Sequence, residues 1–134
     1  MKTIGPNVWG PHGWKFMHYV SLGYPQVPTE NDKRNYKEFY SNLKNVLPCK
    51  TCAMNYERNL TELPIDNALQ SRDSLVKWVI DIHNKVNSEL GKPIVSPEDA
   101  LQLYMKEDKP VLDYCFKILV LIIILCFLYQ VLKK

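Results

Sequence analysis

The sequence predicts an all-α protein: a four-helix bundle with a short fifth helix, followed by a C-terminal single transmembrane helix. Apolar side chains recur every three or four residues in several segments, which is the spacing of one helix face. This pattern is strongest in residues 74–90. An uncharged run, residues 118–132, lies close to the C-terminus. No segment has a convincing strand pattern or an internal repeat, so we expect helices throughout.

The first two helices have clear start and stop signals. Pro11 suits the first turn of the first helix, which ends before the sequence GYPQVP at residues 23–28. Thr29 and Asn31 are both candidate N-caps for the second helix. Pro48 ends that helix, because proline disfavours helical backbone in the residue before it.

The next three helices follow the same rules. The third starts around a cysteine pair and ends before Pro64. Ser71 or Asp73 caps the fourth helix, and Gly91 closes it. The fifth and shortest helix starts at Ser96, which is its cap and is followed by a proline at the first helical position.

Length and composition limit the class of protein. A chain of 134 residues with 46% hydrophobic and 23% charged residues is expected to form one globular domain. The net charge of +3 is mild and no block of lysine and arginine stands out, which argues against a nucleic-acid partner. Four cysteines are too few for a disulfide-rich secreted scaffold. The first ten residues lack the apolar core of a signal peptide.

The uncharged C-terminal run predicts a membrane anchor. Ile118–Leu132 would be roughly 22 Å long as a helix, somewhat short of the ~30 Å hydrocarbon core. A start near Val111 lengthens the helix but includes Asp113 and Lys117. The alternative is a buried core helix. We favour the anchor because the segment is apolar on all sides and a chain of this size has little core to cover it.

These observations divide the chain into three expected parts. Residues 1–106 form the folded domain, residues 107–117 a juxtamembrane linker, and residues 118–132 the core of the anchor.

Cys49 and Cys52 form the only Cys-x-x-Cys in the chain. A zinc site needs four ligands, and the three histidines lack a zinc-binding spacing relative to the pair. A purely structural disulfide that closes so short a loop would stabilise the fold little. A redox-active pair is favoured because a predicted helix follows the cysteines, and the positive end of a helix dipole stabilises a thiolate. A thioredoxin-like fold would also fit the motif, but it needs strands.

Aromatic, imidazole and amide side chains gather in two segments, residues 9–25 and 78–93. His83 and Asn87 are four residues apart, so their polar ends share one helix face. Each of these residues taken alone is more readily explained as core or as solvated surface. Together they suit a flat heteroaromatic ring with polar edges. No G-x-G-x-x-G is present, so a dinucleotide site here would not be of the Rossmann type.

Three motifs resemble those of the Erv/ALR family of FAD-linked sulfhydryl oxidases. They are W-G-x-x-x-W-x-x-x-H-x(5)-Y-P at residues 9–25, P-C-x-x-C at residues 48–52, and W-x-x-x-x-H-N-x-V-N-x-x-L-G-K-P at residues 78–93. The resemblance covers residues 9–105. The short N-terminus is most similar to members from large cytoplasmic DNA viruses.

The resemblance implies a helical bundle that holds FAD, usually as a homodimer, and that passes electrons from a dithiol through the cysteine pair to FAD and then to O2, giving H2O2. Cys49 would be the outer cysteine that exchanges with substrate, and Cys52 the cysteine that faces the flavin. No metal is implied. The residues expected to bind FAD are Gly10, His12, Gly13, Trp14, His18, Tyr24, His83, Asn84, Val86, Asn87, Lys92 and Tyr104.

The chain departs from the family pattern in its other cysteines. Many cellular members carry a structural disulfide after L-G-K-P, whereas this chain has no cysteine between residues 94 and 104. Helix packing is expected to hold the fifth helix instead. Cys115 and Cys126 do not form an obvious shuttle pair. A separate small dithiol protein, thioredoxin-like or carrying Cys-x-x-Cys, is therefore expected to deliver electrons to Cys49.

The expected location is a membrane, with the domain facing the cytosol, in a virion or a membrane derived from the host endoplasmic reticulum. Asn59 opens an Asn-Leu-Thr glycosylation acceptor, and a glycan there would place the domain in a lumen instead. The alternative function is a cofactor-free, membrane-anchored dithiol carrier or scaffold protein.

Overall fold

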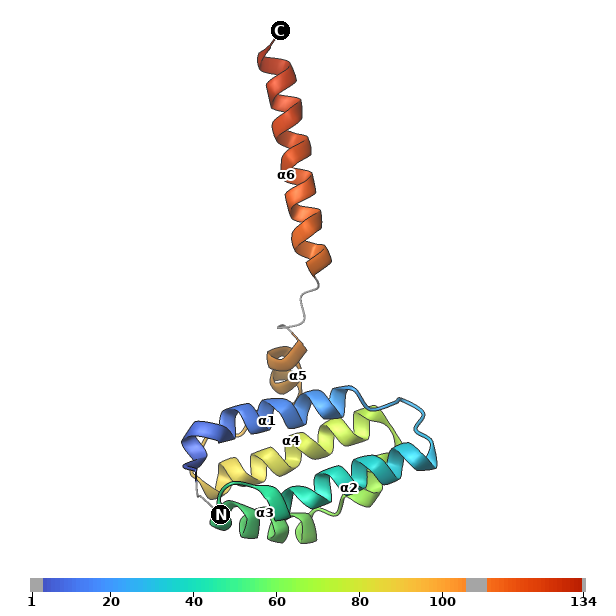
Figure 1. Ribbon diagram of the computed structural model, residues 1–134, viewed down its shortest axis with the longest axis vertical. Helices are drawn as coiled ribbons and strands as arrows, with labels where there is room; N and C mark the ends of the chain where they lie inside the picture. The colour runs from blue at the N-terminus through green and yellow to red at the C-terminus, as the bar shows by residue number, and fades with distance from the viewer. Residues whose placement is uncertain (1–3, 106–110, 134) are drawn as a thin grey trace. The chain divides into compact units, whose positions relative to one another are not determined.

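The computed structural model describes residues 4–105 and 111–133, which contain six α-helices, one 3-10 helix and no strand (Figure 1). The predicted all-α class is confirmed. The chain divides after Leu101 into two compact units, residues 1–101 and 102–134. Each unit is described by itself.

Helix α1 (Pro6–Leu22) starts five residues earlier than the sequence predicts. Pro6 takes the first-turn position that we expect for Pro11. Pro11 lies inside the helix, where it has no N–H to donate to the carbonyl of Asn7. One missing hydrogen bond near the helix start does not end the helix, so the prediction of a start at Pro11 is wrong.

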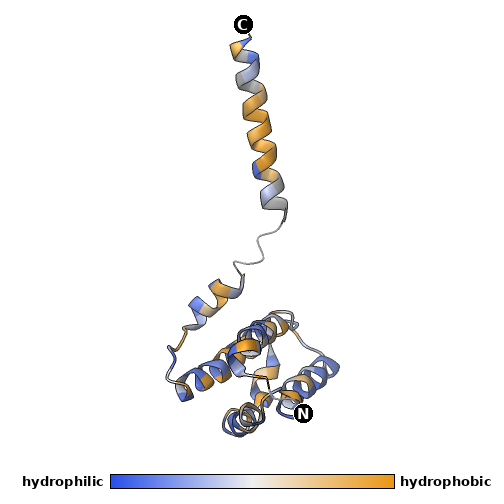
Figure 2. Cartoon of the chain, turned by 60° about the vertical axis from the view of Figure 1, so that its left-hand side comes forward, coloured by the Kyte–Doolittle hydropathy of each residue, from blue (hydrophilic) through white to orange (hydrophobic). Residues whose placement is uncertain are grey.

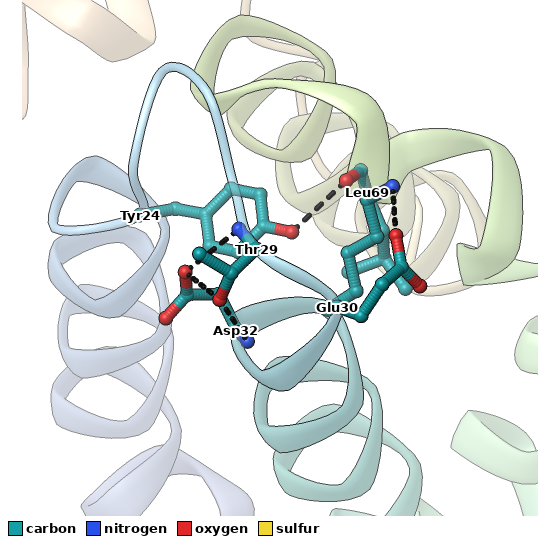
Figure 3. Close-up of polar contacts among 6 residues, drawn as sticks. Tyr24, Thr29, Glu30, Asp32 and Leu69 are labelled. Carbon is teal, nitrogen blue, oxygen red and sulfur yellow. Dashed lines mark hydrogen bonds and ion pairs between the residues drawn. The ribbon is translucent and has the colours of Figure 1, made fainter.

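Helix α2 (Glu30–Val46) begins at a capping box formed by Thr29 and Asp32. The Asp32 backbone N–H donates to the Thr29 hydroxyl at 3.2 Å, and the Thr29 N–H donates to the Asp32 carboxylate at 2.9 Å (Figure 3). These bonds satisfy N–H groups that a helix start leaves without intrahelical partners. Of the two candidate caps, the structure uses Thr29.

Helix α3 (Lys50–Glu62) starts directly after Cys49, as predicted. It is followed by a 3-10 helix, η1 (Ile65–Gln70), which the sequence pattern does not predict. Side chains in a 3-10 helix repeat every three residues and the runs are short. A search for the 3.6-residue period of an α-helix therefore misses η1.

Helix α4 (Arg72–Glu89) carries the strongest apolar pattern and begins at a second capping box, formed by Ser71 and Ser74. It ends close to Gly91, whose φ of 64° is the left-handed conformation that glycine adopts at helix ends. Ser71 and Gly91 confirm the predicted limits of this helix.

Three buried tyrosines tie the elements of the bundle together. The hydroxyl of Tyr24 donates to the Leu69 carbonyl in η1 at 2.9 Å (Figure 3). The hydroxyl of Tyr40 in α2 donates to the Met17 carbonyl in α1 at 2.8 Å, and that of Tyr56 in α3 donates to the Tyr40 carbonyl at 3.0 Å. Burial raises the pKa of all three hydroxyls, so they remain protonated donors.

The core lies between α1, α2, α3, η1 and α4. Aromatic rings pack edge to face within it: the rings of Tyr40 and Trp78 are 5.3 Å apart at 77°. The buried members of the core are Met17, Tyr24, Tyr40, Tyr56, Ile65, Ala68, Leu69, Leu75, Trp78, Val79 and Ile82.

Two ion pairs show how α3 and α4 are oriented. Arg58 pairs with Glu89 at 2.9 Å, and Glu62 pairs with Lys85 at 2.5 Å. Residue numbers rise along α3 as they fall along α4, so the two helices are antiparallel. The start of α3 therefore lies at the end of the bundle where α4 finishes.

The start of α1 lies at this same end. The backbone N–H of Ile4 donates to the Pro48 carbonyl at 2.9 Å, which joins the segment before α1 to the residue before Cys49. Figure 1 shows the beginnings of α1 and α3 on one side of the bundle. The cysteine pair, the first turns of α1 and the last turns of α4 thus meet at one end.

The remaining helices are α5 (Pro97–Met105) and α6 (Val111–Leu132). The short fifth helix is confirmed, and residues 107–110 of the predicted linker lie outside the described residues. The middle of α6 is strongly apolar (Figure 2), and its side chains from Ile118 to Leu125 are exposed. A search of the described residues finds no helix with the length and apolarity needed to cross a membrane.

Candidate functional site

Cys49 and Cys52 form a disulfide at the start of α3, with their Cα atoms 5.2 Å apart. Cys49 is the N-cap of the helix, and its sulfur accepts a hydrogen bond from the Cys52 backbone N–H at 3.2 Å. The sulfur therefore lies where the first N–H groups of the helix point. Such a position favours the thiolate when the disulfide is reduced.

The two cysteines differ in their surroundings. Cys52, Tyr56 and Asn59 share one face of α3 because they are four and three residues apart, and both Tyr56 and Asn59 are buried. Cys52 is thus on the helix face that points into the bundle, although it is only half-buried. Cys49 is 8% exposed. Exposure alone therefore does not identify Cys49 as the outer cysteine.

Aromatic and imidazole rings from α1 and α4 meet in one cluster. The rings of Trp14 and His83 stack with centroids 4.1 Å apart and planes 8° from parallel. His18 Nε2 lies 3.0 Å from His83 Nδ1, so one imidazole donates a hydrogen bond to the other. The sequence predicts all three as cofactor-binding residues, and the fold brings them together.

Both imidazoles are neutral at pH 7. Burial and, to a smaller extent, the adjacent His83 lower the pKa of His18 to about 4. Burial also lowers the pKa of His83 to about 4, with a smaller effect from the positive charge of Lys92. A neutral imidazole has one donor and one acceptor nitrogen, which the hydrogen bond between the two rings requires.

Asn84 lies next to this cluster in sequence, but its side chain is used within the protein. Its amide donates to the Val95 carbonyl at 2.8 Å and accepts from the Val95 N–H at 3.0 Å. This two-bond tie, which we call the Asn84 clamp, holds the chain between α4 and α5 against α4. The clamp lies two residues before the start of α5 at Pro97.

Lys92 and Asn87 lie where α4 ends. The Lys92 backbone N–H donates to the Asn87 carbonyl at 2.8 Å. Asn87 is buried and Lys92 is exposed. Lys92 influences the pKa of His83, so its ammonium group carries a positive charge to the edge of the ring cluster.

The other predicted residues of α1 and α4 vary in position. Gly10 and Val86 are half-buried and His12 is exposed. Gly13 lies under the ring of Trp9, because a Cβ atom there would come within 3.1 Å of the Trp9 ring. The small side chain at Gly13 therefore fixes where the indole of Trp9 lies.

One predicted residue of the N-terminal unit, Tyr24, is not brought to the cluster. Tyr24 is completely buried, its hydroxyl is bonded to Leu69, and Arg72 donates to its carbonyl, which places it beside the start of α4. His83 lies 11 residues after Arg72 in α4, which corresponds to roughly 16 Å along the helix axis. Tyr104 belongs to the C-terminal unit.

The sequence patterns do not predict two side chains whose polar atoms are buried without a hydrogen-bond partner. Within the described residues, the indole Nε1 of Trp9 and both amide atoms of Asn59 are buried without a hydrogen-bond partner. The sequence signal for Asn59 is its spacing: it lies three residues after Tyr56, on the buried face of α3, where a polar side chain is unusual. Asn59 is completely buried, so the folded domain cannot present it to a glycosyltransferase.

These features define a class: a helical bundle with a redox disulfide at one helix start and a neutral aromatic and imidazole cluster between two other helices. The chain belongs to the Erv1 / Alr family, whose family model matches residues 11–108. The predicted family is thereby confirmed.

Named relatives come from viruses and from cells. The chain is 44% identical over 108 residues to a probable FAD-linked sulfhydryl oxidase of Acanthamoeba polyphaga mimivirus, covering 80% of this chain and 76% of the relative. It is 36% identical over 86 residues to the mitochondrial FAD-linked sulfhydryl oxidase ERV1 of Saccharomyces cerevisiae, covering 63% of this chain. That match spans less than half of the yeast protein, 43%.

Solved structures agree with the fold. The crystal structure of the yeast Erv1 core matches with a TM-score of 0.71 and 28% identity, over 78% of this chain and 86% of that one. The crystal structure of the FAD-binding domain of Erv1 from Saccharomyces cerevisiae matches with a TM-score of 0.70 and 29% identity, over 75% of this chain and 94% of that one.

The histidine pair makes stability depend on pH. Because both folded-state pKa values are lowered to about 4, the unfolded chain binds more protons between pH 6.5 and pH 4. The stability present above pH 6.5 is thus lost as the pH falls through this window. We expect the free energy of unfolding to drop by roughly 3–4 kcal/mol between pH 7 and pH 5, about half of it from each histidine, as measured by urea denaturation.

His83→Gln should make this pH dependence clearly shallower, while His12→Gln, at an exposed position, should leave it unchanged. An equal slope in the parent chain and in His83→Gln would contradict the assignment of the effect to the pair.

Proposed function

We propose that this protein is an FAD-dependent thiol oxidase that forms disulfides in substrate proteins. Electrons pass from a protein dithiol through Cys49 and Cys52 to FAD and then to O2, which yields H2O2. The observation that carries this function is the disulfide at the N-terminus of α3, in a chain whose family relatives are named FAD-linked sulfhydryl oxidases.

The ring cluster fits FAD. The stacked pair of Trp14 and His83 offers flat faces to a heteroaromatic ring, and the two neutral histidines add polar edges without a buried charge. The buried N–H of Trp9 lacks a partner, as expected of a donor meant for a ligand. Lys92 supplies a positive charge suited to phosphate. When bound, FAD supplies the two-electron acceptor and the chemistry with oxygen.

The cysteine pair performs the exchange with substrate. A substrate thiolate attacks the Cys49 sulfur, a mixed disulfide forms, and Cys52 leaves as a thiolate. The second substrate thiol then attacks the mixed disulfide and releases Cys49 as a thiolate. The N–H groups at the start of α3 stabilise these anions, and the position of Cys52 on the inward face directs it toward the bundle.

A cofactor-free dithiol carrier or scaffold is the competing function. It would use the same disulfide, but it would leave the partnerless N–H of Trp9 unexplained. It would also purify without colour and consume no oxygen.

The outer face of α1 and α2 supports a homodimer. Val8 and Phe16 on α1 and Val46 on α2 are exposed by 67%, 57% and 55%. The rings of Phe16 and Phe39 meet edge to face at 6.0 Å, which joins the two helices across this face. A shallow groove runs beside it along α2. A second copy of the chain would cover these apolar side chains, which monomers rarely leave exposed together.

The C-terminal segment supports a membrane anchor, with the domain on the cytosolic side. The support for the anchor is the uncharged sequence from Ile118 to Leu132, part of which lies outside the described side chains. The support for the cytosolic side is Asn59: a glycan added in a lumen before folding would prevent α3 from packing.

Cys49→Ser and Cys52→Ser should each lower oxygen uptake with dithiothreitol by at least about 100-fold while the flavin absorption band remains. Cys126→Ser, which removes an exposed cysteine outside the pair, should keep full activity. The measurement is an oxygen electrode trace on protein with a known flavin content. A colourless protein after addition of FAD would favour the carrier or scaffold instead.

Phe16→Glu should convert the dimer to a monomer, because a second copy would have to bury the new charge. Sedimentation of the detergent-solubilised protein measures the mass. Val27→Glu is the matched control, since Val27 is 87% exposed in the loop between α1 and α2. Equal masses for the two variants would rule out this face as the dimer contact.

Replacing Ile122 and Ile124 together by lysine should move the protein from the alkaline-resistant membrane fraction to the soluble fraction, because charges at the middle of a membrane are costly. Lys117→Arg should stay with the membrane. In sealed vesicles that expose the cytosolic face, added protease should digest the domain. Protection of the domain would contradict the proposed orientation.

A further inference from the structure

The segment before α1 is extended and lies against the residue before the disulfide. Gly5 has φ −58° and ψ 134°, which is extended backbone. The N–H of Ile4 donates to the Pro48 carbonyl at 2.9 Å. The Ile4 side chain is 42% exposed, and the backbone bond connects this segment to the residue before the cysteine pair.

This contact lies directly at the site of thiol exchange. Pro48 precedes Cys49, and Cys49 is only 8% exposed. An attacking sulfur has to approach Cys49 along the line of the disulfide bond. Pro48 is the residue next to Cys49, so a polypeptide bonded to Cys49 through its own cysteine has neighbouring backbone within reach of the Pro48 carbonyl, which accepts from Ile4 in this structure.

We propose that the Pro48 carbonyl is a backbone docking point for an extended segment of the dithiol substrate, and that the chain's own Ile4 occupies it as a substitute. The substrate class is then an extended polypeptide that donates a backbone N–H close to its cysteine, as opposed to a small thiol. This inference rests on the proposed thiol oxidase function and adds how the substrate is recognised.

The exchange then has a defined order. The substrate N–H replaces that of Ile4 on the Pro48 carbonyl, so one hydrogen bond is lost and one is formed. The substrate thiolate bonds to the Cys49 sulfur as the bond between Cys49 and Cys52 breaks, and Cys52 takes the electron pair as a thiolate. The second substrate thiolate displaces Cys49, so the substrate is oxidised by two electrons and the enzyme pair is reduced by two.

An exposed apolar side chain in the first turns of α3 would be available to such a partner. Met54, two residues after Cys52, is 70% exposed. Methionine is flexible and adapts to different apolar side chains. Backbone recognition at Pro48 and an adaptable contact at Met54 would both tolerate substrates of different sequence.

Two substitutions at one position separate the backbone bond from the side chain. Ile4→Pro and Ile4→Ala both remove the exposed side chain, but only proline removes the N–H. The first readout is the rate at which iodoacetamide alkylates Cys49 in the reduced full-length protein, with the modified site identified by mass spectrometry. We expect Ile4→Pro to raise this rate at least threefold and Ile4→Ala to leave it within experimental error. Equal rates in the two variants would overturn the proposal.

The second readout is oxygen uptake with two reductants, a reduced synthetic peptide containing Cys-x-x-Cys and dithiothreitol, which has no backbone N–H. We expect Ile4→Pro to raise kcat/KM for the peptide several-fold more than for dithiothreitol. An equal rise for both would mean that Ile4 only covers Cys49, and it would overturn the docking point. No oxygen uptake by the parent chain with dithiothreitol, together with an intact alkylation contrast, would instead refute the oxidase function alone.

Discussion

The bundle depends on three tyrosine hydroxyls that are buried and yet fully used. Each donates to a backbone carbonyl of another element, and in this way α1, α2, α3 and η1 are joined in one network. A buried hydroxyl without a partner would be costly, and a phenylalanine would pack equally well in any of several registers. The hydrogen bonds therefore set how far each helix is shifted along its neighbour, which apolar packing alone does not fix.

The register of the helices determines the chemistry at one end of the bundle. Because α3 and α4 are antiparallel, the cysteine pair lies where α4 ends, and the rings of Trp14 and His83 meet along the same helices. The positive end of α3 stabilises a thiolate of the reduced cysteine pair. The two histidines of the ring cluster stay neutral because burial lowers their pKa values. The bundle thus combines a site that favours an anion, at the start of α3, with a neutral, flat surface between α1 and α4.

Local sequence patterns predict most of the helices, because an amphipathic period and a capping residue are properties of adjacent positions. Ser71, Gly91 and the start of α3 at Cys49 are of this kind. The start of α1 is not, because Pro6 and Pro11 both suit a first turn. In the site, Trp14, His18 and His83 are brought together as predicted. The uses of Tyr24 and Asn84 depend on carbonyl groups far away in the chain, and no local pattern contains that information. The same holds for Asn59, whose burial follows from packing between helices.

The Asn84 clamp has a consequence for how the newly synthesised chain folds. The tie that holds the chain after α4 consists of two amide hydrogen bonds and contains no sulfur. Among the described residues, the structure contains one disulfide, between Cys49 and Cys52. These cysteines are the redox pair and are only three positions apart, so their disulfide does not join distant parts of the fold. A newly made chain can therefore reach its folded shape before any oxidant is available. Within the described residues, the fold of this oxidase thus does not depend on a further disulfide, which is the product that it makes.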